Sequence, residues 1–167
     1  MAPTVLDPFQ AVRSGSALAY LIITGSIAGS AVFPVLPSET MLFTAGAAAG
    51  AGSLQVPLVM VTGAVGSLLG DAIGYAFGRL LGERALERFA RGDRGRRTVN
   101  WAQRTLLRRG GPLVAVGRFI PGGQTAVSLT AGSLGLPFAR YAVFSSIGAV
   151  VWGVYGTLVG ALGAGAV

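Results

Sequence analysis

The chain has 167 residues, of which 52% are hydrophobic and 11% are charged, a composition typical of one integral membrane domain rather than a soluble protein. The net charge of +7 does not indicate nucleic acid binding, because ten of the thirteen arginines lie between Arg79 and Arg109, directly after a hydrophobic stretch. Cysteine and histidine are absent, which excludes disulfides, thiolate or imidazole catalysis and the usual zinc and haem ligands, so we expect neither metal nor cofactor.

The first two predicted elements are a membrane span over residues 17–33 and a re-entrant hairpin over residues 34–52. The span is an uncharged run, just long enough to cross a hydrocarbon core about 30 Å thick. The hairpin contains Pro34 and Pro37, then Glu39, then a run of glycine and alanine. Because proline removes a backbone donor and lipid cannot satisfy a broken backbone, we expect two short helices joined by a covered break.

A second span over residues 56–81 and a basic segment over residues 82–109 follow. In the span, glycine recurs every four residues from Gly66 to Gly82, which predicts a smooth face for close packing, with Asp71 beside it. In the basic segment the apolar residues Leu86, Phe89 and Ala90 fall at i, i+3 and i+4, which predicts that part of it is an amphipathic helix on the membrane surface. Its arginines place it in the cytoplasm.

A second re-entrant hairpin over residues 112–136 and a third span over residues 139–165 complete the chain. The hairpin breaks at "PGG", which begins at Pro121, shortly after Arg118. Tyr141 is expected at the membrane interface, as an anchor at the start of the third span.

The two hairpins resemble each other, because "TAG" at residues 44–46 recurs at residues 130–132 and a glycine-punctuated span follows each copy. With the basic segment in the cytoplasm, the first hairpin enters from outside and the second from inside. We therefore predict an all-α membrane protein with three membrane-spanning helices and two opposed re-entrant hairpins, arranged as an inverted repeat. In such proteins the binding site lies where the two halves meet.

The second hairpin carries a predicted anion site. A half-helix that begins near Gln124 would direct its free N–H groups and its positive end toward the Arg118 guanidinium. A fork of donors beside a helix N-terminus suits a phosphate or a carboxylate. We expect the substrate to contact Arg118, Gln124, Gly122 and Gly123, with Ser38 from the first hairpin.

Glu39 and Asp71 are the carboxylates that this interpretation places deepest. Ser38 is expected to cap the ascending helix of the first hairpin, with Glu39 in its first turn. A charge buried in lipid requires a partner or water. The sequence leaves two roles open for both carboxylates: to load and release a proton, or to act as a counter-ion of Arg118.

Three segments, in this order and spacing, resemble the DedA family of membrane proteins, whose shared region is also called the VTT or SNARE-associated domain. They are "FPVLPSETMLFTAG", "GDAIGYAFGRLLG" and "GRFIPGGQTAVSLTAG", and the resemblance covers roughly Ile27 to Leu162. It implies two opposed re-entrant hairpins and lipid translocation. Bacterial members are linked to the return of undecaprenyl phosphate across the plasma membrane and to the proton motive force, and eukaryotic relatives to phospholipid scrambling.

By this resemblance, Glu39 is the acidic position of the first hairpin and Arg118 is the first arginine of the second. Two positions depart from the family pattern. Many members carry a second arginine where this chain has Gln124, and several carry a glutamate where it has Ile27. One positive and one negative charge are thus absent together, as expected if they pair in relatives. The departures bear on the strength of phosphate binding and on proton coupling.

Together these patterns predict a multi-pass flippase of the bacterial plasma membrane that is not an enzyme. Its expected partners are an anionic phospholipid or polyprenyl phosphate, foremost undecaprenyl phosphate, together with protons; a homo-oligomer stays open. One alternative is a proton-coupled exporter of small solutes or ions, and another is a structural or chaperone-like membrane protein. An enzyme acting on lipid phosphate is disfavoured, because Ser38, Thr125 and Ser128 have no evident base except Glu39.

Overall fold

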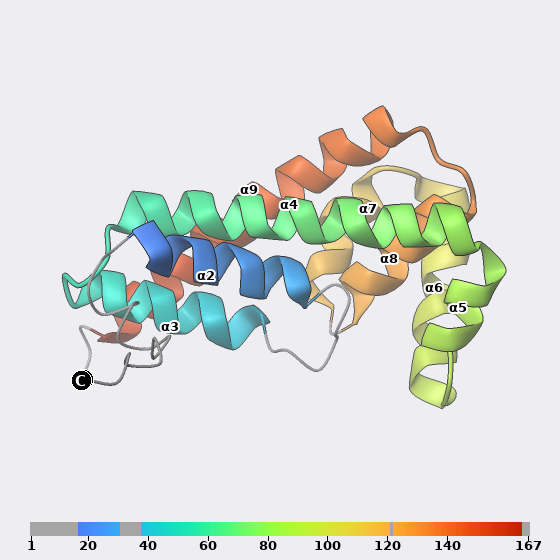
Figure 1. Cartoon of the computed structure of the whole chain (residues 1–167). Helices are drawn as coiled ribbons and strands as arrows, with labels where there is room; N and C mark the ends of the chain where they lie inside the picture. Colours follow the sequence, from blue (N-terminus) through green and yellow to red (C-terminus); the bar gives the residue numbers. More distant parts are fainter. Residues whose placement is uncertain (1–16, 31–37, 121, 165–167) are drawn as a thin grey trace, which may run out of the picture.

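A computed structural model of the chain describes residues 17–30, 38–120 and 122–164, which form helices joined by short turns and contain no strand (Figure 1). In chain order the helices are α2 (Ala17–Gly29), α3 (Ser38–Gly50), α4 (Val56–Leu81), α5 (Glu83–Phe89), α6 (Asp93–Arg109), α7 (Pro112–Val116), the 3₁₀ helix η1 (Gly117–Phe119), α8 (Gly123–Ser133) and α9 (Phe138–Ala164). The all-helical fold class is therefore confirmed.

Two of these helices, α4 and α9, are long and apolar enough to cross a membrane, with 26 and 27 residues. They occupy the residues expected of the second and third spans. The first predicted span is not matched at its full length, because α2 has 13 residues and would extend only about 20 Å at 1.5 Å per residue. Residues 31–33 of that span lie outside the described residues. Three spanning helices are thus not confirmed.

One face of α4 is apolar and uncovered, and the other face is buried. Large hydrophobic side chains four residues apart are exposed along the whole helix: Val61, Val65, Leu69, Ile73, Phe77 and Leu81. The glycines of the predicted stripe lie on the buried face from Gly66 to Gly78, while Gly82 ends the helix with a φ of 53°. An uncovered apolar stripe along a long helix suits contact with lipid, whereas the glycine face packs against neighbouring helices.

The two predicted hairpins are described to different extents. In the first, Ser38–Gly50 is one continuous helix, and Pro34 and Pro37 lie outside the described residues. In the second, α7 and η1 are followed by a break at which Gly122 has a φ of 72°, and α8 begins at Gly123. Such a left-handed conformation favours glycine. The helix, break, helix pattern is thus present, and re-entry into a membrane stays a prediction.

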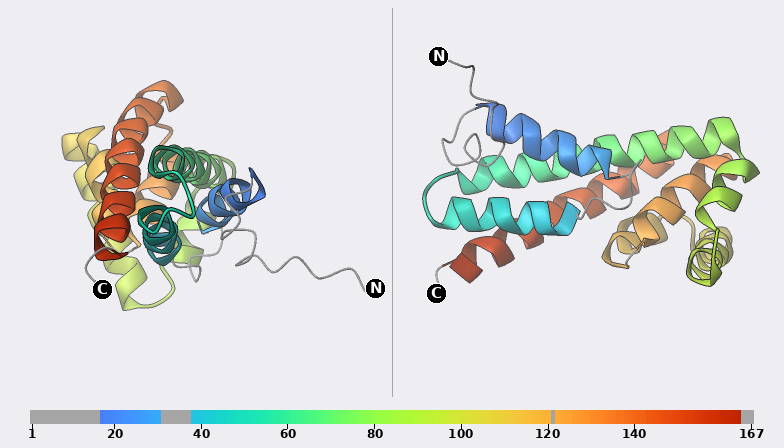
Figure 2. Two further views of the ribbon diagram at one scale, coloured as in Figure 1. Left: turned by 90° about the vertical axis from the view of Figure 1, so that its left-hand side faces the viewer. Right: turned by 60° about the horizontal axis from the view of Figure 1, so that its bottom comes forward.

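The fold has two halves, α2 to α4 and α7 to α9, and the short helix of each half packs against the long helix of the other. α3 packs against α9 and α8 packs against α4, while α2 packs against α4 and α7 against α9. Figures 1 and 2 show α4 and α9 running in opposite directions, with the N-terminal ends of α3 and α8 pointing toward each other near the middle of the molecule. The short helix of each half therefore packs against the long helix of the other half, while the inverted membrane topology of the two halves stays a prediction.

The glycines of the two "TAG" copies occupy equivalent places in this packing. A Cβ on Gly46 would collide with the backbone carbonyl oxygen of Thr157 on α9, and a Cβ on Gly132 would collide with that of Tyr75 on α4. Each short helix therefore meets its long partner backbone to backbone, which only glycine permits.

The long helices α4 and α9 also have glycines at these contacts. A Cβ on Gly78 of α4 would strike the carbonyl oxygen of Leu129, and a Cβ on Gly160 of α9 would strike that of Phe43. Phe43 and Leu129 each lie three residues before the glycine of their "TAG" copy. The resemblance between the two copies thus corresponds to a repeated packing contact.

The basic segment forms α5 and α6, which lie across the end of the molecule where α4 ends and α9 begins (Figure 1). α6 buries Val99, Ala102 and Leu106 in a core that it shares with α7, α8 and the start of α9. A second core surrounds Trp152 of α9 with residues of α2, α3 and α4. The residues on which the amphipathic helix was predicted, Leu86, Phe89 and Ala90, lie on α5 and at its C-terminal end, and Leu86 is buried in the same core. A position on the membrane surface stays a prediction.

Candidate functional site

Arg118 lies in η1, between the end of α7 and the break at Gly122. Pro112 starts α7, and the short helix then tightens into one 3₁₀ turn that carries Arg118. The side chain is turned inward and the residue is only 7% exposed. Its guanidinium carbon lies 5.8 Å from the centroid of the Trp152 ring on α9, within range of a cation–π contact.

Asp71 of α4 is the carboxylate that contacts Arg118. The Arg118 Nη2 donates a hydrogen bond to Asp71 Oδ2, and both side chains are 3% exposed. The Ser145 hydroxyl of α9 donates to the same carboxylate oxygen. Asp71 is therefore held by α9 and by η1, and the ion pair lies at the junction of the two halves.

A second chain of hydrogen bonds connects this pair to the start of α8. The Tyr141 hydroxyl lies 3.3 Å from the backbone carbonyl oxygen of Asp71 and donates to Ser128 Oγ at 2.8 Å. Ser128 in turn donates to the backbone carbonyl oxygen of Gln124 at 2.9 Å. Tyr141 and Ser128 thus lie between the backbone of Asp71 and the N-terminal turn of α8.

Two polar atoms of this site have no hydrogen-bond partner within the described residues, although both are shielded from solvent. They are Arg118 Nε, a donor, and Gln124 Oε1, an acceptor. A buried polar atom without a partner costs roughly 1–3 kcal/mol. Within the described residues, the second hairpin thus contains one buried donor and one buried acceptor that the protein does not satisfy.

The other expected site residues lie around this network. Gly123 is buried against η1, and Gly122 is exposed at the break. Ser38 is half-buried and Glu39 is exposed, both in the first turn of α3. Within the described part of the chain neither forms an ion pair or a side-chain hydrogen bond, so the carboxylate paired with Arg118 is Asp71 rather than Glu39.

Sequence reasoning missed two members of the network, Tyr141 and Ser145. The interfacial place predicted for Tyr141 is wrong, because its side chain is 1% exposed and packs against Tyr75 with ring centroids 5.0 Å apart. A signal was present: Tyr141, Ser145 and Trp152 recur at helical spacing on one face of an otherwise apolar helix. Polar residues aligned on a spanning helix indicate an interior contact.

Comparison with known proteins gives one family match, to the VTT domain, over residues 36–162. The chain is 29% identical to Protein DedA of Escherichia coli over 126 residues, which are 74% of this chain and 58% of that protein. It is 29% identical to an alkaline phosphatase-like protein of Lactococcus lactis over 129 residues, 74% of this chain and 60% of the relative.

A third relative, an uncharacterized membrane protein of Mycobacterium leprae, is 26% identical over 156 residues, 90% of this chain and 70% of the relative. No solved structure matches the chain. The chain spans less than two thirds of the E. coli and L. lactis relatives, and the VTT match includes both Asp71 and Arg118.

Proposed function

Because this chain belongs to the DedA family of membrane proteins, which share the VTT domain, we propose that it moves a lipid with an anionic headgroup between the leaflets of a membrane. The observation that carries the proposal is the buried guanidinium of Arg118, with Nε unpartnered in the described residues, beside the start of α8. A guanidinium binds phosphate and carboxylate oxygens in the same geometry, so a phosphate can take the place of Asp71.

In the proposed cycle, Asp71 neutralises Arg118 while the site is without substrate. An unpaired arginine at membrane depth costs at least about 2.5 kcal/mol, so the exchange of one anion for another keeps the guanidinium paired throughout. The headgroup binds Arg118, and Gln124 accepts a hydrogen bond from it. Asp71 then retains only the Ser145 hydroxyl as its donor, so its buried charge is left without Arg118 at a cost in free energy. That cost favours the return of Asp71 to Arg118, which releases the headgroup.

Proton coupling is assigned to Glu39, with Asp71 as the internal competitor. Glu39 is exposed on the first turn of α3, whose N-terminus points toward that of α8 (Figure 2). Within the described residues, Glu39 forms no ion pair with Arg118, which is paired with Asp71. Ser38 precedes Glu39, and Gly122 and Gly123 form the break, so these residues lie at the facing ends of the two hairpins.

The lipid tail would stay in the bilayer against the uncovered faces of α4 and α9, so that only the headgroup passes through protein. Undecaprenyl phosphate is the proposed lipid, by the family resemblance, and the proposed location is the bacterial plasma membrane with the basic segment 82–109 in the cytoplasm. A homo-oligomer is compatible with the proposal.

The test is leaflet exchange in liposomes that contain the purified protein. Fluorescent undecaprenyl phosphate and phosphatidylserine are followed with and without a pH gradient, for wild type, Arg118→Ala and Glu39→Gln. Arg140→Ala is the matched control, because Arg140 is an exposed arginine at the start of α9. We expect Arg118→Ala to abolish exchange, Glu39→Gln to remove its dependence on the gradient, and the control to exchange lipid at the wild-type rate.

Two other functions are separated by the same measurement. Phosphate released from the lipid would favour an enzyme, the class that the name of the L. lactis relative suggests for that protein. Proton movement that does not depend on long-chain lipid would favour an exporter of small solutes. Wild-type exchange rates in Arg118→Ala would refute the proposed role of the buried pair.

A further inference from the structure

A hollow on the outer side of α6 lies apart from the Arg118 site. It has a volume of about 440 Å³ and is lined by Trp101, Arg104, Thr105 and Arg108, which recur at helical spacing on one side of the helix. We call it the α6 hollow. The opposite side of α6 is buried in the core through Val99, Ala102 and Leu106, so the lining residues are presented by a fixed helix.

The lining of the α6 hollow suits a phosphate group. Arg104 and Arg108 are exposed, Thr105 adds a hydroxyl, and no acidic residue of the described part of the chain lines the hollow. Arginine forks bind phosphate oxygens in two-point contacts. Trp101 is partly buried against the core, which fixes its indole at the edge of the hollow. Tryptophan is the residue that favours the boundary between lipid and water.

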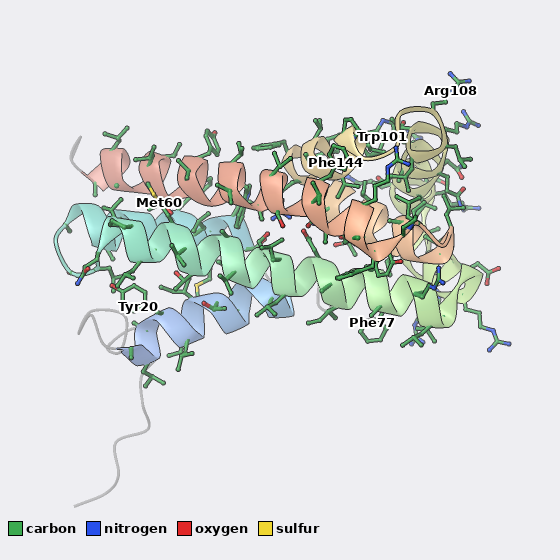
Figure 3. The ribbon with its side chains drawn as sticks, turned by 90° about the horizontal axis from the view of Figure 1, so that it is seen from above. Tyr20, Met60, Phe77, Trp101, Arg108 and Phe144 are labelled. Carbon is green, nitrogen blue, oxygen red and sulfur yellow. The ribbon has the colours of Figure 1, made fainter. Side chains whose placement is uncertain are left out.

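The position of the α6 hollow favours a lipid over a soluble anion. α6 runs crosswise to α4 at the end of that candidate span, so it lies along the membrane surface if α4 crosses the membrane (Figure 1). Figure 3 shows Trp101 and Arg108 at this end of the molecule, above the start of α9. Leu107, next to the hollow, is 76% exposed, and Leu80 near the end of α4 is 83% exposed. Exposed leucines beside arginines are typical of an interfacial helix.

We propose that the α6 hollow binds the phosphate of an anionic phospholipid headgroup in the leaflet that α6 touches. Arg104 and Arg108 contact the phosphate oxygens, Trp101 packs against the glycerol region, and Leu107 inserts beside the acyl chains. The site is distinct from Arg118 and concerns binding alone, so it does not depend on lipid transport.

The test uses the full chain in uncharged detergent micelles with Trp152→Phe as the background, which leaves Trp101 as the sole tryptophan. Trp101 fluorescence is recorded during titration with dioctanoyl phosphatidylglycerol, dioctanoyl phosphatidylcholine or inorganic phosphate. We expect phosphatidylglycerol to shift the emission and to bind at least roughly tenfold more tightly than phosphatidylcholine, because both lipids carry the phosphate but the choline cation of phosphatidylcholine is repelled by the two arginines. Equal binding of inorganic phosphate would overturn the assignment to a lipid.

The matched variants remove the same charge at two places. Arg104→Gln with Arg108→Gln alters the hollow, and Arg84→Gln with Arg88→Gln removes two exposed arginines at the same spacing on α5. Arg118 is retained in both. We expect the first pair to weaken phosphatidylglycerol binding at least roughly tenfold and the second pair to leave it within about twofold. Equal losses in the two pairs, or no loss in the first, would overturn the proposal.

Discussion

Asp71 of α4 and Arg118 of η1, 47 residues apart in the sequence, form a buried ion pair between the two halves of the protein. Each charge needs the other, because neither side chain has access to water that would solvate it. The same contact occupies the guanidinium on which the proposed transport depends. One pair of residues therefore bears on both the stability and the function of the fold.

The first prediction concerns the stability of this pair. Arg118→Gln or Asp71→Asn alone leaves one buried charge without its partner and should lower the free energy of unfolding in mixed micelles by about 3–5 kcal/mol. The double variant Asp71→Asn with Arg118→Gln removes both charges, so its loss should be smaller than the sum of the single losses by at least about 2 kcal/mol. Additive losses would show that the two side chains do not interact.

The second prediction concerns Ser145, whose hydroxyl donates to Asp71. Ser145→Ala should lower the free energy of unfolding by about 1.5–3 kcal/mol, because a hydrogen bond to a buried carboxylate is lost. Ser146→Ala makes the same change one residue along α9, at a half-buried position, and should have an effect within about 0.5 kcal/mol. If both variants unfold under the same conditions, the Ser145 contact contributes nothing.

The third prediction tests the repeated glycine contact. Gly46→Ala and Gly132→Ala should each destabilise the fold by about 1–3 kcal/mol, because the new methyl group forces α3 from α9 or α8 from α4. Gly25→Ala is the control, since no other described residue has an atom within 4 Å of a Cβ there, and it should stabilise α2 by up to about 1 kcal/mol. A marked difference between Gly46→Ala and Gly132→Ala would argue against equivalent packing in the two halves.

The fourth prediction separates Glu39 from the buried pair. Because Glu39 is exposed, Glu39→Gln should change the free energy of unfolding by less than about 0.5 kcal/mol. The same variant should lose the response of lipid exchange to a pH gradient. Circular dichroism melting and the liposome assay measure the two effects on one preparation. A large loss of stability would place Glu39 in an interaction that the described residues do not contain.

Much of the fold could be predicted from the sequence, because helix length, breaks and repeats depend on residues that are close together in the chain. Apolar length identified α4 and α9, the glycines near Pro121 identified the break before α8, and the two "TAG" copies pointed to the repeat. The length of the first predicted span could not be predicted correctly, since residues 17–33 contain no charge that marks where α2 ends.

The partners within the site could not be predicted in the same way. Arg118 and Asp71 were each identifiable as buried charges, but their pairing depends on how α4 packs against the second hairpin. Ser145 and Tyr141 belong to the site because α9 packs against it from the other side. The hydropathy of α9 predicts a long apolar helix but not which helices it contacts. From the sequence, Glu39 was an equally reasonable partner of Arg118. In the structure Arg118 is paired with Asp71 of α4 instead.

The most direct test of the central claim, that a phosphate headgroup replaces Asp71 on Arg118, is the affinity of the purified protein for undecaprenyl phosphate, measured by native mass spectrometry. We compare wild type with folded samples of Asp71→Asn and Arg118→Gln. Asp71→Asn removes the competing anion and should tighten binding by at least roughly tenfold, whereas Arg118→Gln should weaken it by a similar factor. Weaker binding in Asp71→Asn, or unchanged binding in Arg118→Gln, would contradict the claim.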